Sequence, residues 1–130
     1  MSTQSHETHA PLISGLAVIA IYVSNLDRAL EFYHGLLGLE KAGPMEPGVL
    51  LKAGETVLYL EGGRQVLAAP EMVGCTVSMC LQGPSIRRIW THLREHGVPV
   101  VESWLQHGED FAMFRVADPD GHVIEFAGTP

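Results

Sequence analysis

The segment VIAIYVSNLDRALEFYHGLLG at residues 18–38 decides the fold, because a segment of the same pattern, SMCLQGPSIRRIWTHLREHGV, follows it at residues 78–98. Both begin with alternating apolar residues and then change to i, i+4, i+7 spacing. That change of period is expected where a half-buried strand leads into an amphipathic helix. The chain is therefore predicted to contain two copies of one unit. The matched apolar positions are Ile19 with Met79, Ile21 with Leu81, Leu26 with Ile86, Ala29 with Ile89, Leu30 with Trp90, and Tyr33 with Leu93.

The starts of both predicted helices carry recognisable signals. Ser24 and Asn25 can begin the first helix, with Asp27 placed as the acidic partner of a capping box on Ser24. The second helix is expected to begin at Gly83-Pro84-Ser85, where the proline suits a first turn.

Three strand-like runs follow each helix, so each half is predicted to have the order βαβββ. The runs are 40–42, 49–53 and 56–61 in the first half, and 98–103, 111–116 and 122–127 in the second. They define one domain at 12–130, with module one at 14–61, a linker at 62–71 and module two at 72–128. The expected fold class is α+β, in which two βαβββ modules form curved mixed sheets around a concave pocket with the helices outside.

The chain resembles the vicinal oxygen chelate superfamily, which holds glyoxalase I, extradiol dioxygenases, fosfomycin-resistance enzymes and bleomycin-resistance proteins. Three segments carry the likeness: IYVSNLDRALEFYHGLLGLE (21–40), HLREHGV (92–98) and FRVADPDGHVIEFAGTP (114–130). Members of this superfamily often pair as dimers, and the edge strands of the predicted sheets leave backbone groups that a second copy can cover. We therefore expect a homodimer.

Composition and charge argue against several partners and locations. The 8 Lys and Arg residues against 15 Asp and Glu give a net charge of −7, the wrong sign for a nucleic-acid binder. The longest apolar run, residues 16–23, is too short to cross a membrane. Residues 1–11 lack the features of a secretory signal and are expected to be a flexible tail. Cys75 and Cys80 are placed on opposite faces of one strand, beyond disulfide reach, which favours a cytoplasmic protein with free thiols.

Strand alternation predicts which side chains line the concave pocket. If Ile19 and Ile21 pack under the first helix, the residues between and beside them point into the pocket, and the repeat extends the assignment to the second half. The residues assigned to the pocket face are Val18, Ala20, Tyr22, Val57, Tyr59, Glu61, Ser78, Cys80, Gln82, Val123 and Glu125.

The resemblance also implies where a metal would bind. Metal-dependent members use a donor that opens the first strand of each half and a carboxylate on each closing strand. Those places hold Val18, Tyr59, Ser78 and Glu125, of which only Glu125 is a good ligand for a divalent ion. We expect no metal and no other cofactor, although Glu61 or Cys80 with Glu125 remains an alternative set of donors.

The remaining pocket residues suggest a ligand. Tyr22, Tyr59 and Trp104 can stack on a flat molecule, although packing in the core or an interface is an equal alternative. Glu125 is a candidate acceptor or general base, or else a carboxylate held by amides or water. Gln82 and Arg115 are candidate polar lining, with the face of Arg115 left open.

The histidines are expected to play minor roles. His92-Leu93-Arg94-Glu95-His96 matches the zinc-protease pattern H-x-x-E-H, but its helix buries the opposite stripe and no third ligand is evident. His107 is placed in a loop at the pocket mouth, and His122 is expected to be exposed in a turn.

These observations lead to one main functional hypothesis and two alternatives. The first is a metal-independent protein of the bleomycin-resistance type that binds a small, partly aromatic, cationic molecule. The second is a lyase, dioxygenase or thiol transferase with an atypical metal site or a cofactor-free site centred on Glu125. The third is an interaction module.

Overall fold

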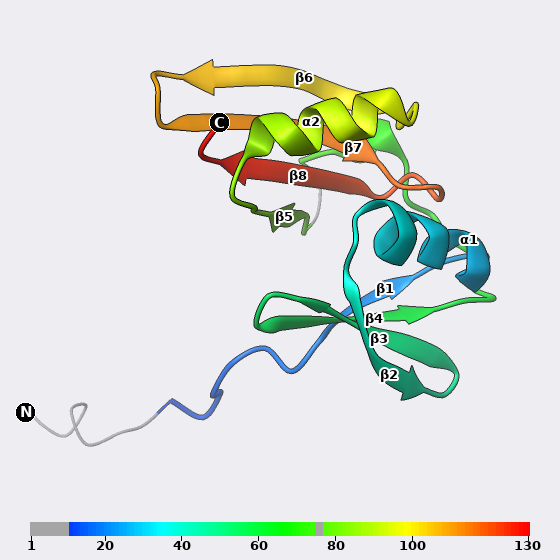
Figure 1. Ribbon diagram of the computed structural model, residues 1–130. Helices are drawn as coiled ribbons and strands as arrows, with labels where there is room; N and C mark the ends of the chain where they lie inside the picture. The colour runs from blue at the N-terminus through cyan, green and yellow to red at the C-terminus, as the bar shows by residue number, and fades with distance from the viewer. Residues whose placement is uncertain (1–10, 75–76) are drawn as a thin grey trace, which may run out of the picture.

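The computed structural model describes residues 11–74 and 77–130, shown in Figure 1. Module one contains β1 (Ile19–Tyr22), α1 (Leu26–Leu30), the π-helical turn η2 (Glu31–Leu36), β2 (Glu40–Met45), β3 (Gly48–Ala53) and β4 (Thr56–Glu61). A short 3-10 helix, η3 (Pro70–Met72), precedes module two, which contains β5 (Met79–Leu81), α2 (Ile86–Glu95), β6 (Val100–His107), β7 (Phe111–Ala117) and β8 (Val123–Gly128). The predicted strand position of Cys75, and the predicted tail apart from Pro11, lie outside the described residues.

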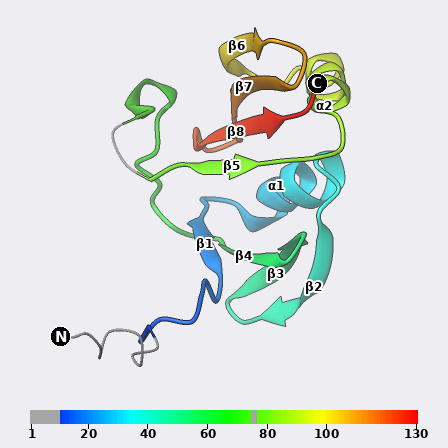
Figure 2. The same ribbon diagram turned by 90° about the vertical axis from the view of Figure 1, so that its left-hand side faces the viewer.

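Each module forms one four-stranded mixed sheet, which confirms the predicted α+β class with two βαβββ modules. The expectation that both helices lie outside is not met by α1, which lies between the sheet of module one and module two (Figures 1 and 2). The strand orders are β1-β4-β3-β2 and β5-β8-β7-β6. In both sheets the first strand pairs in parallel with the last, and the other pairs are antiparallel. The helices begin at Leu26 and Ile86, in register with the sequence repeat.

The first helix begins one residue later than the capping box predicts. Its N-cap is Asn25, whose side-chain oxygen accepts from the backbone N–H of Arg28 at 3.0 Å. Ser24 Oγ instead donates to Asp120 Oδ1 at 2.6 Å, so the capping box with Asp27 is wrong. Because the Ser24 hydroxyl is bonded to the Asp120 carboxylate of module two, the side chain of Asn25 caps the helix.

Two strands, β2 and β6, run well past their predicted ends. β2 continues from Glu40 to Met45 through Gly43 and Pro44, which is tolerated because β2 is an edge strand that pairs only with β3. β6 reaches His107, so the prediction that His107 lies in a loop is wrong. The His107 side chain is exposed, with its ring centroid 6.2 Å from that of Phe111.

Burial alternates along the strands as the sequence predicts. On β1, Ile21 is 8% exposed and Tyr22 is 44% exposed, so one face is covered and the other is open. The covered faces of both sheets share one hydrophobic core, because α1 lies between the sheet of module one and module two (Figures 1 and 2). The largest fully buried side chains of this core are Tyr33, Phe114, Leu51, Leu58, Leu60, Ile86, Leu93, Ile124, Val23 and Val116.

The turn between β7 and β8 fastens module two to module one. Tyr33 Oη, fully buried, donates to Asp118 Oδ2 at 2.6 Å, and the backbone N–H of Ser24 donates to Asp120 Oδ2 at 2.9 Å. His122 Nε2 donates to the carbonyl of Tyr22 at 2.9 Å. The His122 side chain is thus half-buried, and the prediction of an exposed side chain is wrong because its ring is bonded to the end of β1. Two of the segments that carry the family resemblance, 21–40 and 114–130, therefore contact each other directly.

Within the described residues, no helix is long and apolar enough to cross a membrane.

Candidate functional site

The open face of module one carries a polar cluster that we call the module-one cluster: Tyr22, Tyr59, Glu61 and Arg64. β1 and β4 place these side chains together, since Ala20 pairs with Tyr59 and Tyr22 with Glu61. Tyr59 Oη donates to Glu61 Oε1 at 3.1 Å, Arg64 forms an ion pair with Glu61, and the Arg64 guanidinium lies 4.5 Å from the centre of the Tyr22 ring. Partial burial and the bond to Glu61 raise the pKa of Tyr59, so its hydroxyl is a neutral donor. The cluster offers two aromatic rings beside a balanced ion pair.

The open face of module two carries a second group, the module-two cluster: Cys80, Glu102, Arg115 and Glu125. Arg115 Nη2 lies 2.7 Å from Glu125 Oε1, and the same guanidinium also pairs with Glu102. Arg115 Nε is buried without a hydrogen-bond partner in the described structure. With two carboxylates around one arginine, the cluster has a net negative charge.

The Cys80 thiol belongs to this second cluster. Its Sγ lies 3.5 Å from Glu125 Oε2 and can donate to it. Burial and the neighbouring Glu125 raise the pKa of Cys80, an effect that Arg115 partly offsets. The cysteine is therefore a thiol at neutral pH, and the thiolate is the reactive form.

The structure places the predicted site residues in different surroundings. Tyr22, Tyr59 and Glu61 lie in the module-one cluster, while Cys80 and Glu125 lie in the module-two cluster. Among the described residues, no hydrogen bond or ion pair joins the two clusters. Gln82 is exposed at the end of β5. The open question about Arg115 is answered, since it lies beside Glu125.

Trp104 lies on the helix side of its sheet. Its ring centroid is 6.0 Å from that of Trp90 on α2, and the Arg87 guanidinium lies 4.5 Å from its ring. Its Nε1 donates to Gln106 Oε1 at 3.3 Å. The ring therefore packs beneath α2 and is not placed beside Glu125.

The donors at the family's metal positions do not fit a divalent ion. Val18 has no donor atom, Ser78 and neutral Tyr59 are weak ligands, and Glu125 is already paired with Arg115. In the part of the chain that the structure describes, no three His, Cys, Asp or Glu side chains gather closely enough to hold a metal. No chemical step is therefore assigned to a metal here.

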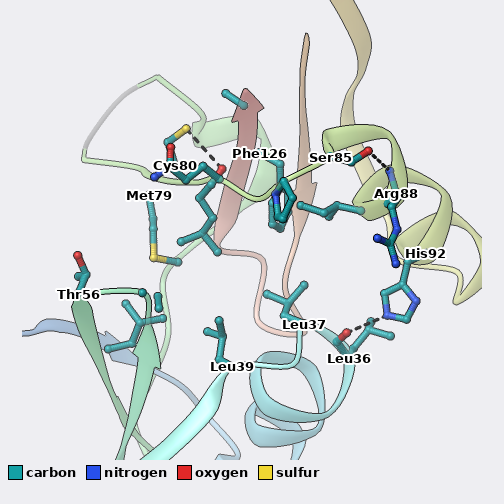
Figure 3. A pocket seen from close by; sticks show the side chains of 18 of the residues that line it. Leu36, Leu37, Leu39, Thr56, Met79, Cys80, Ser85, Arg88, His92 and Phe126 are labelled. Atoms are coloured by element: carbon teal, nitrogen blue, oxygen red, sulfur yellow. Dashed lines mark hydrogen bonds between the residues drawn. The ribbon is translucent and has the colours of Figure 1, made fainter. Parts of the chain in front are cut away.

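A cleft of about 1060 Å³ lies between the two modules (Figure 3). Of the predicted site residues, only Cys80 and Gln82 line it. Sequence reasoning missed this cleft because its walls come from two modules whose relative placement no local pattern encodes. A usable signal is the run of Leu36, Leu37 and Leu39 at the end of the first helix, which is more apolar than one buried stripe requires.

His92 bridges the cleft at one end. Its Nε2 donates to the carbonyl of Leu36 at 2.8 Å, which ties α2 to the end of η2. The His96 ring centroid is 4.6 Å from that of His92, and His96 Nδ1 donates to the His92 carbonyl at 2.8 Å. The H-x-x-E-H segment therefore makes structural contacts with its histidines.

Comparison with known proteins gives a consistent result. The family model described as Glyoxalase/Bleomycin resistance protein/Dioxygenase superfamily matches residues 15–126. Glutathione transferase FosA of Serratia marcescens is 26% identical over 116 residues, covering 88% of this chain and 80% of that protein.

Two solved structures illustrate the match in fold. A glyoxalase/dioxygenase from Nostoc punctiforme superposes with a TM-score of 0.76 at 19% identity, covering 99% of each chain. The fosfomycin resistance protein FosX of Listeria monocytogenes superposes with a TM-score of 0.73 at 17% identity, covering 89% of this chain and 93% of that one. At these identities the structures show a shared fold.

Proposed function

Because the chain belongs to the glyoxalase/bleomycin resistance protein/dioxygenase superfamily, we propose that it is a metal-independent member that binds a small, partly aromatic molecule. The observation that carries the proposal is the ion pair between Glu125 and Arg115. The one strong donor among the four family positions forms a 2.7 Å ion pair with Arg115, and the valine, serine and tyrosine at the other three cannot replace it.

The proposed assembly is a homodimer in which each site combines the module-one cluster of one copy with the module-two cluster of the other. The support is that the two clusters lie on separate open faces and that β1 and β5 are edge strands in the described structure. Val18 and Tyr22 on the open face of module one are 40% and 44% exposed, which leaves apolar surface for a second copy to cover. Light scattering at micromolar concentration should give twice the chain mass of 14.1 kDa; a mass of one chain would contradict this assembly.

The proposed ligand is planar and cationic. The rings of Tyr22 and Tyr59 provide surfaces for stacking, and the module-two cluster has two carboxylates around one guanidinium. A ligand cation would share Glu125 or Glu102 with Arg115. The net charge of −7 adds mild attraction at long range.

Binding can be tested with bleomycin and with proflavine, a planar cationic dye, by titration calorimetry. Glu125→Gln should weaken binding about tenfold, as expected for a charged hydrogen bond that is shared with a neighbour. Tyr59→Ala should weaken it by about three- to tenfold through lost ring contact. Glu40→Gln is the matched control, because Glu40 is exposed on the edge strand β2 and pairs only with Lys52 at 3.9 Å. Equal binding by wild type, Glu125→Gln and Tyr59→Ala would refute this site.

A thiol transferase is the second candidate, favoured by the match to Glutathione transferase FosA and by the 3.5 Å contact of Cys80 with Glu125. In this case Glu125 would act as a base. Consumption of glutathione in the presence of fosfomycin, lost in Glu125→Gln and retained in Glu40→Gln, would favour this candidate over the binding protein. The proposed location is the cytoplasm, where the free thiol of Cys80 would stay reduced.

A further inference from the structure

The cleft between the modules has an apolar middle. Leu36, Leu37 and Leu39 form one wall, and Met79 and Phe126 lie across from them (Figure 3). Phe126 belongs to the hydrophobic core, and the other four pack against it and stay partly exposed. At about 1060 Å³, the cleft is slightly larger than the usual range of roughly 300–1,000 Å³ for sites that bind small molecules.

One end of the cleft carries a positive charge without a partner. Arg88, on the first turn of α2, lies there beside Ser85 and His92 (Figure 3). In the described residues the Arg88 guanidinium has no ion pair, hydrogen bond or ring contact. Every other arginine of the chain has one: Arg28 with Asp120, Arg64 with Glu61, Arg87 with Trp104, Arg94 with Trp90, and Arg115 with Glu125.

The opposite end of the cleft carries the opposite charge. Thr56, at the start of β4, lies at the end away from Arg88 (Figure 3), and Glu55 precedes it in the turn after β3 and also lines the cleft. An anion is therefore attracted to the Arg88 end and repelled from the Glu55 end. This polarity gives an elongated ligand one favoured direction.

We propose that this cleft binds a free medium-chain carboxylic acid, with the alkyl chain along the leucine wall and the carboxylate against Arg88. The guanidinium presents two parallel donors that match a carboxylate. Ser85 and His92 already donate to the carbonyls of Pro130 and Leu36, so the guanidinium is the group assigned to the carboxylate. The leucine wall and Arg88 belong to neither cluster, and of the two clusters only Cys80 borders the cleft, so this proposal and the proposed function can fail separately.

The test is titration calorimetry of the full chain with decanoate, and with decanol and decyltrimethylammonium as ligands of the same chain and a different head. Decanoate should bind most tightly, and the cation should not bind in the cleft. Across hexanoate, octanoate and decanoate, affinity should rise roughly fourfold for each CH₂ that enters the cleft. Affinity that does not change with chain length would overturn the proposal.

Two variants of one helix separate this site from nonspecific attraction. Arg88→Gln should weaken decanoate binding about three- to tenfold and leave decanol binding unchanged, because the guanidinium is exposed and its ion pair is partly screened. Arg94→Gln removes the same charge from a side chain that lies over Trp90, 5.0 Å from the ring centre, and should leave decanoate binding unchanged. Equal losses in both variants, or a loss in Tyr59→Ala in place of Arg88→Gln, would refute the assignment.

Discussion

Removal of one hydroxyl, by Tyr33→Phe, should cost the protein a large share of its stability. Tyr33 is fully buried and donates to Asp118 Oδ2 at 2.6 Å, while Asp118 Oδ1 accepts from the backbone N–H groups of Asp120 and His122 at 2.9 and 2.8 Å. Phenylalanine keeps the ring and leaves no cavity, so the change isolates the hydrogen bond. It leaves Oδ2 of a carboxylate that is 5% exposed without its partner.

The expected loss follows from the charge of the acceptor. A hydrogen bond to a charged group contributes about 1.5–3 kcal/mol, and a buried charged group left without its partner costs at least as much. For a chain of this length such a loss lowers the melting temperature by roughly 6–12 °C. Urea denaturation followed by circular dichroism measures the free energy of unfolding directly.

Tyr59→Phe is the matched control for this measurement. It also removes one phenolic hydroxyl bonded to a carboxylate, at 3.1 Å from Glu61, but on an open face where water can replace it. Its effect should be much smaller than that of Tyr33→Phe. A Tyr33→Phe variant within about 0.5 kcal/mol of wild type would refute the claim that this contact fastens the two modules.

Three further predictions follow from features described above. Burial and Asp118 raise the pKa of Tyr33 above its unfolded value of about 10. The contribution of Tyr33 to stability is therefore complete below pH 10 and is lost as the pH rises above it. Urea titrations from pH 9 to 11 should show a steeper fall in the free energy of unfolding for wild type than for Tyr33→Phe, and an equal fall in both proteins would contradict this. Asn25→Ala should lower the free energy of unfolding by about 1 kcal/mol because the first helix loses its N-cap, whereas Asp27→Ala should lower it by under about 0.5 kcal/mol. A larger effect at Asp27 than at Asn25 would support the capping box in place of the Asn25 cap. Purified protein should hold well below one equivalent of Fe, Ni, Zn or Mn by elemental analysis, and chelator should leave its melting temperature unchanged; one equivalent of metal whose removal lowers the melting temperature would favour an atypical metal enzyme.

The fold could be predicted from the sequence because its determinants are local and occur twice. The repeat aligns Ile19 with Met79 and Leu26 with Ile86, and these residues begin equivalent strands and helices. Alternation also assigned the open faces of β1, β4, β5 and β8 in agreement with the observed burial.

The site was harder to predict because it depends on placement between elements. Alternation gives the face of Tyr59 or Glu125 and says nothing of the distance between two sheets. Trp104 shows a second limit, because it follows the predicted end of its strand at residue 103, whereas β6 runs to His107 and its pairing with β7 shifts between Glu102 and Leu105. The cleft around Arg88 shows the first difficulty again, because its walls come from both modules.

The contact between Tyr33 and Asp118 also bears on the history of the repeat. The position that holds Tyr33 in the first copy holds Leu93 in the second, and both side chains are fully buried. A chain made of two first modules would bury two phenols and have no Asp118 to accept from them, and a chain made of two second modules would bury two carboxylates that each face a leucine. The two copies have thus become complementary halves, and neither can substitute for the other even though they share one architecture.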